Sequence, residues 1–219
     1  MEREIAEKLS GELKIDKTQI VREYWEVILL KDLFKSIYGK YLILKGGTAL
    51  RLSYASPRFS EDLDFSLTKD TIKNKFPDLI EEIVEPYAEL TITGIAEKYF
   101  TYLAEIKVTV GYLSIPFRIK IEISRRIQKD YETELRLINP VSSPLQVMGR
   151  IATLEQIYRD KNECIKTRAK PKDLFDLWFT CQKLKIPYPK PDVKISRNIL
   201  RRDLRKYLPS NYWEIIEEL

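Results

Sequence analysis

A predicted strand, a glycine turn and a predicted helix follow one another directly near residue 45. Residues 41–44 form a continuous apolar run, Lys45-Gly46-Gly47 follows this run, and residues 48–52 have the pattern of a helix start. This unit restricts the chain to folds in which strands and helices pack together. It also leaves backbone N–H groups free at the start of the helix, where the helix dipole favours an anion such as phosphate.

A second predicted strand, residues 62–67, alternates between polar and apolar side chains. The apolar members share the face that packs on the core, whereas Asp62, Asp64 and Ser66 share the other face, so the two aspartates point together. Two carboxylates at positions i and i+2 of one strand are fixed anionic ligands for a divalent metal ion. Nucleotidyl and phosphoryl transfer need such an ion to bridge substrate oxygens.

The same periodicities predict the other elements. Residues 15–37 are apolar at helical spacing after Asp16, a predicted N-cap, and residues 117–124 alternate most clearly, with Glu122 on the polar face. Between them we expect a helix over 71–90 and a strand over 99–110. After Pro144 the pattern is helical, with a connection and short helix over 145–154, helices over 154–166 and 172–184, a proline-rich linker, and a basic helix from Ser196.

These elements predict an α+β fold, in which a small mixed sheet bears Asp62, Asp64 and Glu122, helices back the sheet, and a helical C-terminal part follows. A chain of 219 residues has room for one main domain and a smaller second part. We expect the boundary between residues 143 and 144, with the active-site cleft between the two parts.

Histidine is absent, and Cys164 and Cys181 are the only cysteines. The composition therefore excludes imidazole acid–base catalysis, histidine-ligated metal sites and a disulfide framework, so any catalysis must use carboxylates, lysine and metal ions. The formal net charge of +5 and a pI of about 9.0 favour a polyanionic partner such as RNA or a nucleotide. No apolar run reaches the roughly 18 residues of a membrane span, so we expect a cytoplasmic protein without a membrane partner.

Two sequence blocks are similar to those of a known enzyme family. The first block is Lys45-Gly46-Gly47-Thr48-Ala49-Leu50 together with Arg58-x-Ser60-x-Asp62-Leu63-Asp64-Phe65. The second block is Lys161 followed by Arg168-x-Lys170-Pro171-Lys172-Asp173-Leu174-Phe175-Asp176-Leu177. Over about residues 21–183, the chain resembles the AbiEii/AbiGii toxin nucleotidyltransferases, which belong to the DNA polymerase β-like superfamily.

This resemblance implies a nucleotidyltransferase domain over residues 1–143 and a C-terminal helical domain over residues 144–219. It implies a Mg²⁺-dependent enzyme of EC 2.7.7 type, with Mn²⁺ as an alternative metal and an NTP as substrate. It further implies a toxin of a type IV toxin–antitoxin system, with an RNA acceptor such as the 3′ end of tRNA and a cognate antitoxin protein as a partner.

The resemblance also implies roles for individual residues. The expected catalytic residues are Asp62, Asp64, Lys161 and Asp173, and the expected nucleotide-binding residues are Gly46, Gly47, Thr48, Arg58, Ser60 and Lys161. The expected metal ligands are Asp62, Asp64 and Glu122. The chain departs from the family pattern in three places, since Glu122 replaces an aspartate, Lys172 replaces an arginine, and residues 156–160 before Lys161 are not typical.

Several of these roles have a structural alternative. Arg58 and Ser60 either contact the nucleotide or shape the loop, and Glu122 either binds metal or forms an ion pair with Lys120. Asp173 lies in the first turn of a predicted helix, where the helix dipole also favours an acid.

Two further points are open from the sequence. Asp176 is expected to pair with a base such as Arg168 or Lys172. The basic segment from Arg197 to Lys206 is either a solvated helix face or a contact for an RNA backbone. Two other activities also fit the motifs, namely transfer to a small molecule or a protein hydroxyl, and nucleotide or RNA binding without catalysis.

Overall fold

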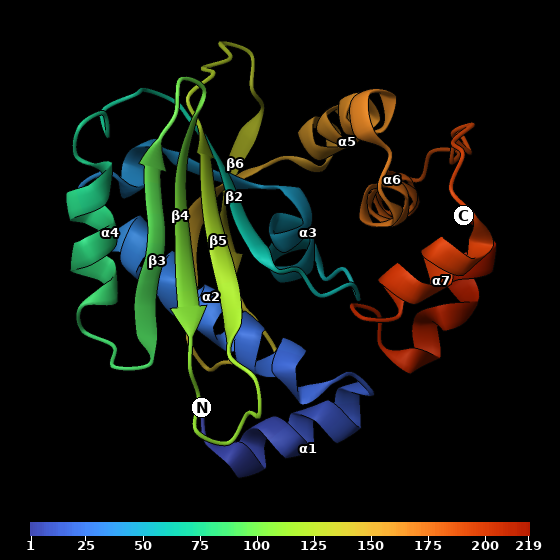
Figure 1. Ribbon diagram of the computed structural model, residues 1–219. Helices are drawn as coiled ribbons and strands as arrows, with labels where there is room; N and C mark the ends of the chain where they lie inside the picture. The colour runs from blue at the N-terminus through green and yellow to red at the C-terminus, as the bar shows by residue number, and fades with distance from the viewer.

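The structure is a computed structural model that describes residues 1–219, and it confirms the predicted α+β fold (Figure 1). Its helices and strands, in chain order, are α1 (Arg3–Leu13), α2 (Lys17–Lys35), β1 (Leu42–Lys45), α3 (Gly46–Tyr54), β2 (Asp62–Leu67), α4 (Phe76–Val84), β3 (Leu90–Glu97), β4 (Thr101–Val108), β5 (Phe117–Ser124), β6 (Thr133–Ile138), β7 (Val147–Ala152), α5 (Leu154–Arg168), α6 (Pro171–Leu184) and α7 (Arg197–Leu204). Short 3₁₀ helices span Gly39–Tyr41 and Ser210–Glu217.

All seven strands form one mixed sheet in the order β3-β4-β5-β2-β1-β7-β6. β2 lies between β1, to which it is antiparallel, and β5, to which it is parallel. This register places Asp62 opposite Lys120 and Asp64 opposite Glu122 and Lys45. The polar residues of three strands therefore meet at the centre of the sheet.

The apolar face of the sheet packs against the long helix α2, where the ring of Phe34 meets that of Phe65 edge-on at 6.0 Å between centroids. The predicted N-cap of α2 is confirmed, because the Asp16 side chain accepts a hydrogen bond from the N–H of Thr18. One core cluster includes 48 buried residues, among them Leu63, Phe65 and Leu67 of β2. The alternation of β2 is thus explained by burial of one face, and it leaves the aspartates on the other.

The structure corrects the sequence prediction after residue 144. A connection with a short helix was expected over 145–154, but Val147–Ala152 is the strand β7, which pairs with β1 and β6. The helical part therefore starts at Leu154, because β7 completes the sheet before the chain leaves it. Whether the sheet and the helices act as two domains stays a prediction.

The sequence prediction for the region between β2 and β4 was also partly wrong. The helix expected over 71–90 is shorter, since α4 starts at Phe76 with Pro77 in its first turn, and the chain from Leu90 forms the edge strand β3. The helix α1 and the strand β6 were not predicted either.

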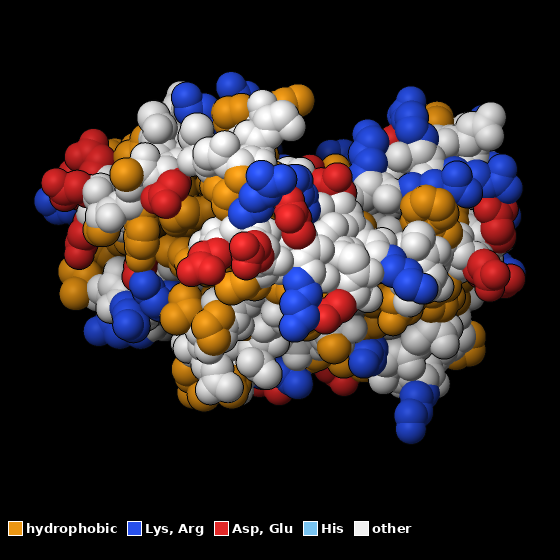
Figure 2. Space-filling view, turned by 90° about the horizontal axis from the view of Figure 1, so that it is seen from below, with side chains coloured by type: hydrophobic (Ala, Val, Ile, Leu, Met, Phe, Trp, Pro, Cys, Tyr) orange, Lys and Arg blue, Asp and Glu red, His pale blue; other side chains and the backbone are white.

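In Figure 1, α5, α6 and α7 gather on the right of the sheet, beyond α3. None of the helices is both long and apolar enough to cross a membrane. Figure 2 shows the molecule from below, where blue and red side chains are interspersed among white and orange ones over the whole face. The positive net charge is thus not concentrated in one patch on this face.

Candidate active site

The two glycines of the first block lie where side chains have no room. Gly46 has φ of +70°, and a Cβ atom there would lie 2.9 Å from Oδ2 of Asp64. A Cβ atom on Gly47 would lie 2.1 Å from Nη2 of Arg58 and 3.1 Å from Oγ of Ser60. The glycines therefore allow the start of α3 to approach β2 and the loop before it. No side chain caps the start of α3, so its first N–H groups stay available to a ligand.

Substitution of Gly47 tests this packing. We expect Gly47→Ala to lower the free energy of unfolding by about 1–3 kcal/mol, because the new methyl group meets a buried guanidinium that cannot move away freely. Gly111→Ala is the matched control, since a Cβ atom at Gly111 meets nothing within 4 Å. Urea unfolding of both variants measures the difference, and equal stability of the two would contradict the close approach.

Thr48 fixes α3 to β2, because its hydroxyl donates a hydrogen bond to the backbone carbonyl of Asp62. Thr48 is buried, so only its backbone N–H is suited to the phosphate contact expected from the sequence. Ser60 lies beside Gly47 and its hydroxyl makes no hydrogen bond within the protein. Its hydroxyl therefore remains available to a nucleotide.

Asp62 and Asp64 face the same cleft, as predicted, and neither carboxylate accepts a hydrogen bond or forms an ion pair within the protein. Burial raises the pKa of both carboxyl groups above the ordinary range, and the charge of Asp62 raises the pKa of Asp64 further. Two crowded carboxylates without a partner have the chemistry of a cation site, because a divalent ion would offset both desolvation and repulsion.

The third expected metal ligand has a partner in the structure. Oε1 of Glu122 lies 2.8 Å from Nζ of Lys120, which is the ion pair left open by the sequence. Glu122 lines the same cleft as the two aspartates. However, no group of three or more Cys, Asp or Glu side chains is arranged to hold a metal ion. Asp62 and Asp64 are the carboxylates of the cleft that have no partner in the protein, and a metal-binding role stays a prediction for them as it does for Glu122.

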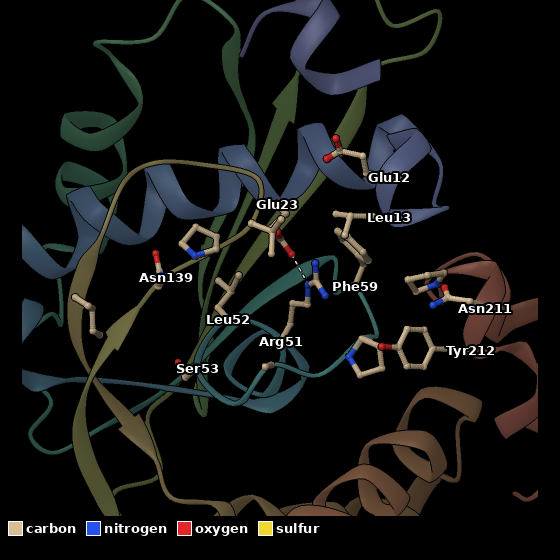
Figure 3. A pocket seen from close by; sticks show the side chains of 16 residues that line it. Glu12, Leu13, Glu23, Arg51, Leu52, Ser53, Phe59, Asn139, Asn211 and Tyr212 are labelled. Carbon is tan, nitrogen blue, oxygen red and sulfur yellow. Dashed lines mark hydrogen bonds and ion pairs between the residues drawn. The ribbon is translucent and has the colours of Figure 1, made fainter. Parts of the chain in front are cut away.

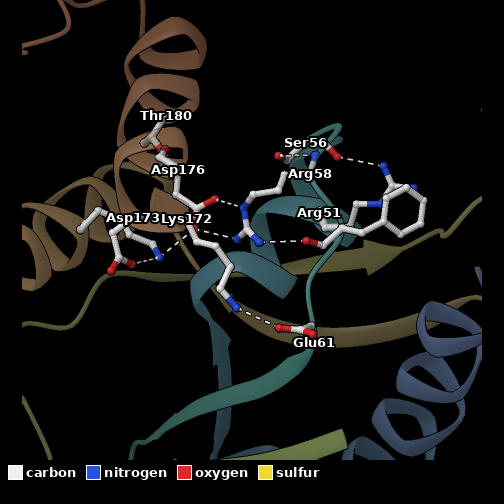
Figure 4. Close-up of polar contacts among 10 residues, drawn as sticks. Arg51, Ser56, Arg58, Glu61, Lys172, Asp173, Asp176 and Thr180 are labelled. Atoms are coloured by element: carbon white, nitrogen blue, oxygen red, sulfur yellow. Dashed lines mark hydrogen bonds and ion pairs between the residues drawn. The ribbon is translucent and has the colours of Figure 1, made fainter. Parts of the chain in front are cut away.

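A buried ionic cluster joins the loop before β2 to the helices α5 and α6 (Figure 4). Arg58 forms a two-fold contact with Asp176, with 2.7 Å from Nε to Oδ1 and 2.8 Å from Nη2 to Oδ2, and its Nη1 donates to the carbonyl of Phe59. Lys161 lies 2.7 Å from Asp176 and 2.8 Å from Asp173. We call Arg58, Lys161, Asp173 and Asp176 the ionic cluster.

Asp176 is the centre of the ionic cluster and not the surface partner of Arg168 or Lys172 that the sequence predicted. Its side chain is completely buried. Burial alone would raise its pKa, but the charges of Arg58 and Lys161 lower that pKa below the ordinary value. Arg58 is separated from Asp176 by 118 residues in the chain, so helical spacing gave no sign of this pair.

The structure brings Lys161 and Asp173 together, as the second block implied. Burial acts to lower the pKa of Lys161, yet the charges of Asp176 and Asp173 raise it above its ordinary value, so the lysine stays protonated. Oδ2 of Asp173 is buried without a hydrogen-bond partner. Lys161 is thus a buried lysine that lines the cleft and not a solvated surface lysine, and its contact with a substrate oxygen stays a prediction.

Arg58 has less freedom than Lys161. Its side chain is buried and its donors are directed to Asp176 and Phe59, so the structure favours a loop-shaping role. Contact between Arg58 and a nucleotide stays a prediction. In Figure 4, Lys172 reaches across to Glu61, with 3.1 Å from Nζ to Oε2, which adds a second link between α6 and the loop before β2.

One continuous cleft contains the residues of both blocks. Its inner part is lined by Gly47, Arg58, Ser60, Asp62, Asp64, Lys120, Glu122, Lys161, Arg168, Lys170, Lys172, Asp173 and Asp176. Its outer part has a volume of about 410 Å³ and shares Asp64, Glu122, Lys161 and Arg168 with the inner part. Sequence reasoning missed Arg126 and Gln128 in the outer part because no motif marks them, and it gave no role to Lys45 although the first block begins there.

Another pocket, of about 470 Å³, lies elsewhere, between α1, α3, the chain after β6 and the C-terminal segment (Figure 3). Arg51 and Glu23 form an ion pair on its floor, with 2.5 Å from Nε to Oε2. It contains none of the residues of the predicted site. A pocket of similar volume thus lacks the carboxylates, the glycine turn and the lysine.

The arginines of the C-terminal segment are mostly engaged within the protein. Arg201 forms a two-fold contact with Glu217, Arg202 pairs with Asp203, and Arg197 donates to the carbonyls of residues 216 and 217. These partners reduce the free positive charge of the segment. The structure thus favours the solvated helix face over an RNA contact there.

The fold and the cleft are those that the sequence predicted for a nucleotidyltransferase. The family model of the nucleotidyl transferase AbiEii toxin, type IV toxin–antitoxin system, matches residues 28–216, and the chain belongs to this family. No curated protein sequence matches the chain.

Solved structures of other proteins have a similar fold. The crystal structure of JHP933 from Helicobacter pylori is 24% identical, with a TM-score of 0.57 over 77% of this chain and 68% of that chain. MenT4, the nucleotidyltransferase toxin Rv2826c from Mycobacterium tuberculosis H37Rv, is 19% identical, with a TM-score of 0.58 over 85% of this chain and 63% of that chain. This chain therefore spans less than two thirds of MenT4.

Proposed function

We propose that this toxin-family nucleotidyltransferase uses a divalent metal ion, Mg²⁺ or Mn²⁺, to transfer a nucleotide from an NTP to an RNA acceptor such as the 3′ end of tRNA. The observation that best supports this proposal is the pair Asp62 and Asp64, which have no partner in the protein and face the uncapped start of α3. Carboxylates for a cation and free N–H groups for phosphate then meet in one cleft.

In the proposed reaction, the acceptor hydroxyl releases its proton to solvent water and its oxygen bonds to the α-phosphorus of the NTP. The bond from this phosphorus to the oxygen of the β-phosphate breaks, and pyrophosphate leaves. The N–H groups of Gly47 and Thr48 bind phosphate oxygens, and Lys161 supplies a fixed positive charge to them. Asp62 and Asp64 would hold the metal ion, which supplies Lewis-acid stabilisation of the charge that develops on the phosphate.

The ionic cluster contributes positioning. Asp173 and Asp176 hold Lys161 at the cleft. Arg58 binds Asp176, and the guanidinium of Arg58 also packs against Gly47. A buried charge held by two carboxylates does not need to reorganise when the substrate binds. We infer that the ionic cluster keeps Lys161 and the glycine turn in fixed positions relative to each other.

An RNA acceptor suits the charge around the cleft. Lys45, Arg126, Arg168 and Lys170 line it, and none of them forms an ion pair with a carboxylate in the protein. Unpaired cations attract phosphate groups, and the attraction weakens with salt. The type IV family further implies a cognate antitoxin, for which we propose no site on this chain.

Labelling identifies the acceptor. We expect the purified protein to label tRNA when it is incubated with each α-labelled NTP, Mg²⁺ and total tRNA, and to leave no label on itself or on small molecules. Omission of the metal ion should abolish labelling. Label on a small hydroxyl compound or on protein would contradict the RNA acceptor, and no transfer with any NTP would indicate a binding module without catalysis.

A further inference from the structure

An exposed aromatic pair lies at the turn between β3 and β4, at the top of the sheet in Figure 1. The side chains of Tyr99 and Phe100 are 83% and 49% exposed, and their rings meet edge to face with centroids 4.5 Å apart. Exposed aromatic residues lose contact with water only when a partner covers them, so two adjacent ones indicate a binding surface.

Free cations lie beside this pair. The guanidinium of Arg126 lies over the Phe100 ring at 4.3 Å from its centroid, and neither Arg126 nor the exposed Lys98, which precedes Tyr99, pairs with a carboxylate. Residues 125–130 read Arg-Arg-Ile-Gln-Lys-Asp, which gives three positive charges and one negative charge. A surface that combines aromatic rings with free cations is complementary to a nucleic acid with unstacked bases.

The surface is held in a fixed position. Arg125 donates from Nη1 to the carbonyl of Lys98 at 2.9 Å, and its backbone N–H donates to the carbonyl of Phe100 at 2.9 Å. Its Nε contacts Asp70, which also accepts a hydrogen bond from the hydroxyl of the buried Tyr102. The β3–β4 turn and the segment after β5 are therefore joined before any ligand binds, which lowers the entropic cost of binding.

The surface is continuous with the candidate active site. Thr101, the residue after Phe100, lines the outer cleft together with Ser124, Arg126 and Gln128. The same cleft reaches Asp64 and Lys161. A single-stranded RNA end that stacks on Tyr99 can thus follow the cleft towards the carboxylate of Asp64.

We propose that Tyr99, Phe100 and Arg126 form a stacking platform for the unpaired 3′-terminal bases of the RNA acceptor. This inference rests on the proposed function and adds the part of the acceptor that the protein reads. Phe100 supports both partners, since Tyr99 meets it edge-on and Arg126 lies over its ring, while the free face of Tyr99 and the guanidinium plane take the bases. Lys98 takes an adjoining phosphate.

The first test is RNA affinity of the full-length protein, measured by fluorescence anisotropy with a hairpin that has a single-stranded 3′ overhang. We expect Tyr99→Ala and Phe100→Ala each to weaken binding roughly 5- to 100-fold, as is usual for loss of one base–aromatic stack. Phe100→Leu should bind RNA little better than Phe100→Ala, because leucine keeps the apolar surface but not the ring. NTP affinity should stay the same in all variants.

Ile115→Ala is the matched control, because Ile115 is 76% exposed and lies in the β4–β5 connection at the other end of the same sheet. It should bind RNA like the wild type. A second control uses the RNA, since replacing the overhang bases by abasic sites should weaken wild-type binding as much as Tyr99→Ala does.

The outcomes separate this inference from the proposed function. If the wild type labels RNA and the Tyr99 and Phe100 variants bind and label it like Ile115→Ala, the stacking platform is wrong and the proposed function stands. If the wild type neither binds nor labels any RNA, the RNA acceptor itself is wrong and the platform falls with it. A blunt hairpin that binds as tightly as the overhang also overturns the platform.

Discussion

Asp64→Asn is expected to abolish nucleotide transfer while the protein remains folded. The amide keeps the shape of the side chain but cannot provide an anionic ligand, and a bound metal ion supplies several kcal/mol of transition-state stabilisation. We therefore expect the transfer rate to fall by about a thousand-fold or more. Initial rates with saturating NTP and RNA measure this loss.

The same variant should lose no stability in the absence of metal, although it loses activity. Burial and the neighbouring charge of Asp62 raise the pKa of Asp64 in the folded protein, so the ionised carboxylate destabilises the metal-free fold at neutral pH. Removing that charge should leave the free energy of unfolding in the absence of metal equal or higher. Asp78→Asn on α4 is the control, because Asp78 is exposed and pairs only with Lys75 at 3.6 Å. An Asp64→Asn enzyme with the activity of this control would refute the assignment.

Asp176→Ala should have the largest effect on stability. The change leaves the guanidinium of Arg58 buried without its partner and removes one of the two carboxylates that hold Lys161. Breaking a buried ion pair in this way costs about 3–5 kcal/mol, because the remaining charge is not solvated. Urea unfolding monitored by tryptophan fluorescence gives the difference.

Glu217→Ala is the matched control for this change. Glu217 also forms a two-fold contact with an arginine, Arg201, but both side chains are more than 40% exposed. Exposed pairs contribute little to stability because water screens them, so this variant should unfold almost like the wild type. Equal stability of the two variants would show that the ionic cluster does not hold α6 against the loop before β2.

The sequence predicted the centre of the fold because local patterns specify it. The alternation of residues 62–67 gave β2 and its polar face, and the glycine turn gave the start of α3. The strands β3, β6 and β7 were missed, since the alternation is only four residues long in β3 (residues 90–93) and in β6 (residues 134–137) and is absent in β7. Gly149, for example, lies in β7 because its missing side chain makes room for Phe34 of α2, which is a contact between distant parts of the chain.

The sequence predicted which residues line the candidate site, but it did not predict which of them contact one another. Lys161 and Asp173 came from the resemblance, and the structure places them 2.8 Å apart. The pair of Arg58 with Asp176 could not be inferred, because the two residues meet only after the C-terminal helices have packed beside the sheet. Nor did the sequence separate free arginines from paired ones, so it left open whether the C-terminal segment contacts RNA, and the proposed contact at the edge of the cleft followed only from the structure.

The fate of the two ends of the NTP tests the central claim most directly. The wild type is incubated with Mg²⁺, the RNA acceptor and an NTP labelled either at the α- or at the γ-phosphate, and the products are separated by size. Nucleotidyl transfer predicts that the α-label appears on the RNA and the γ-label in pyrophosphate, that chelation of the metal stops both, and that Asp64→Asn shows neither. A γ-label on the RNA would mean phosphoryl transfer, and an α-label on the RNA that persists in Asp64→Asn would place the chemistry outside the proposed site.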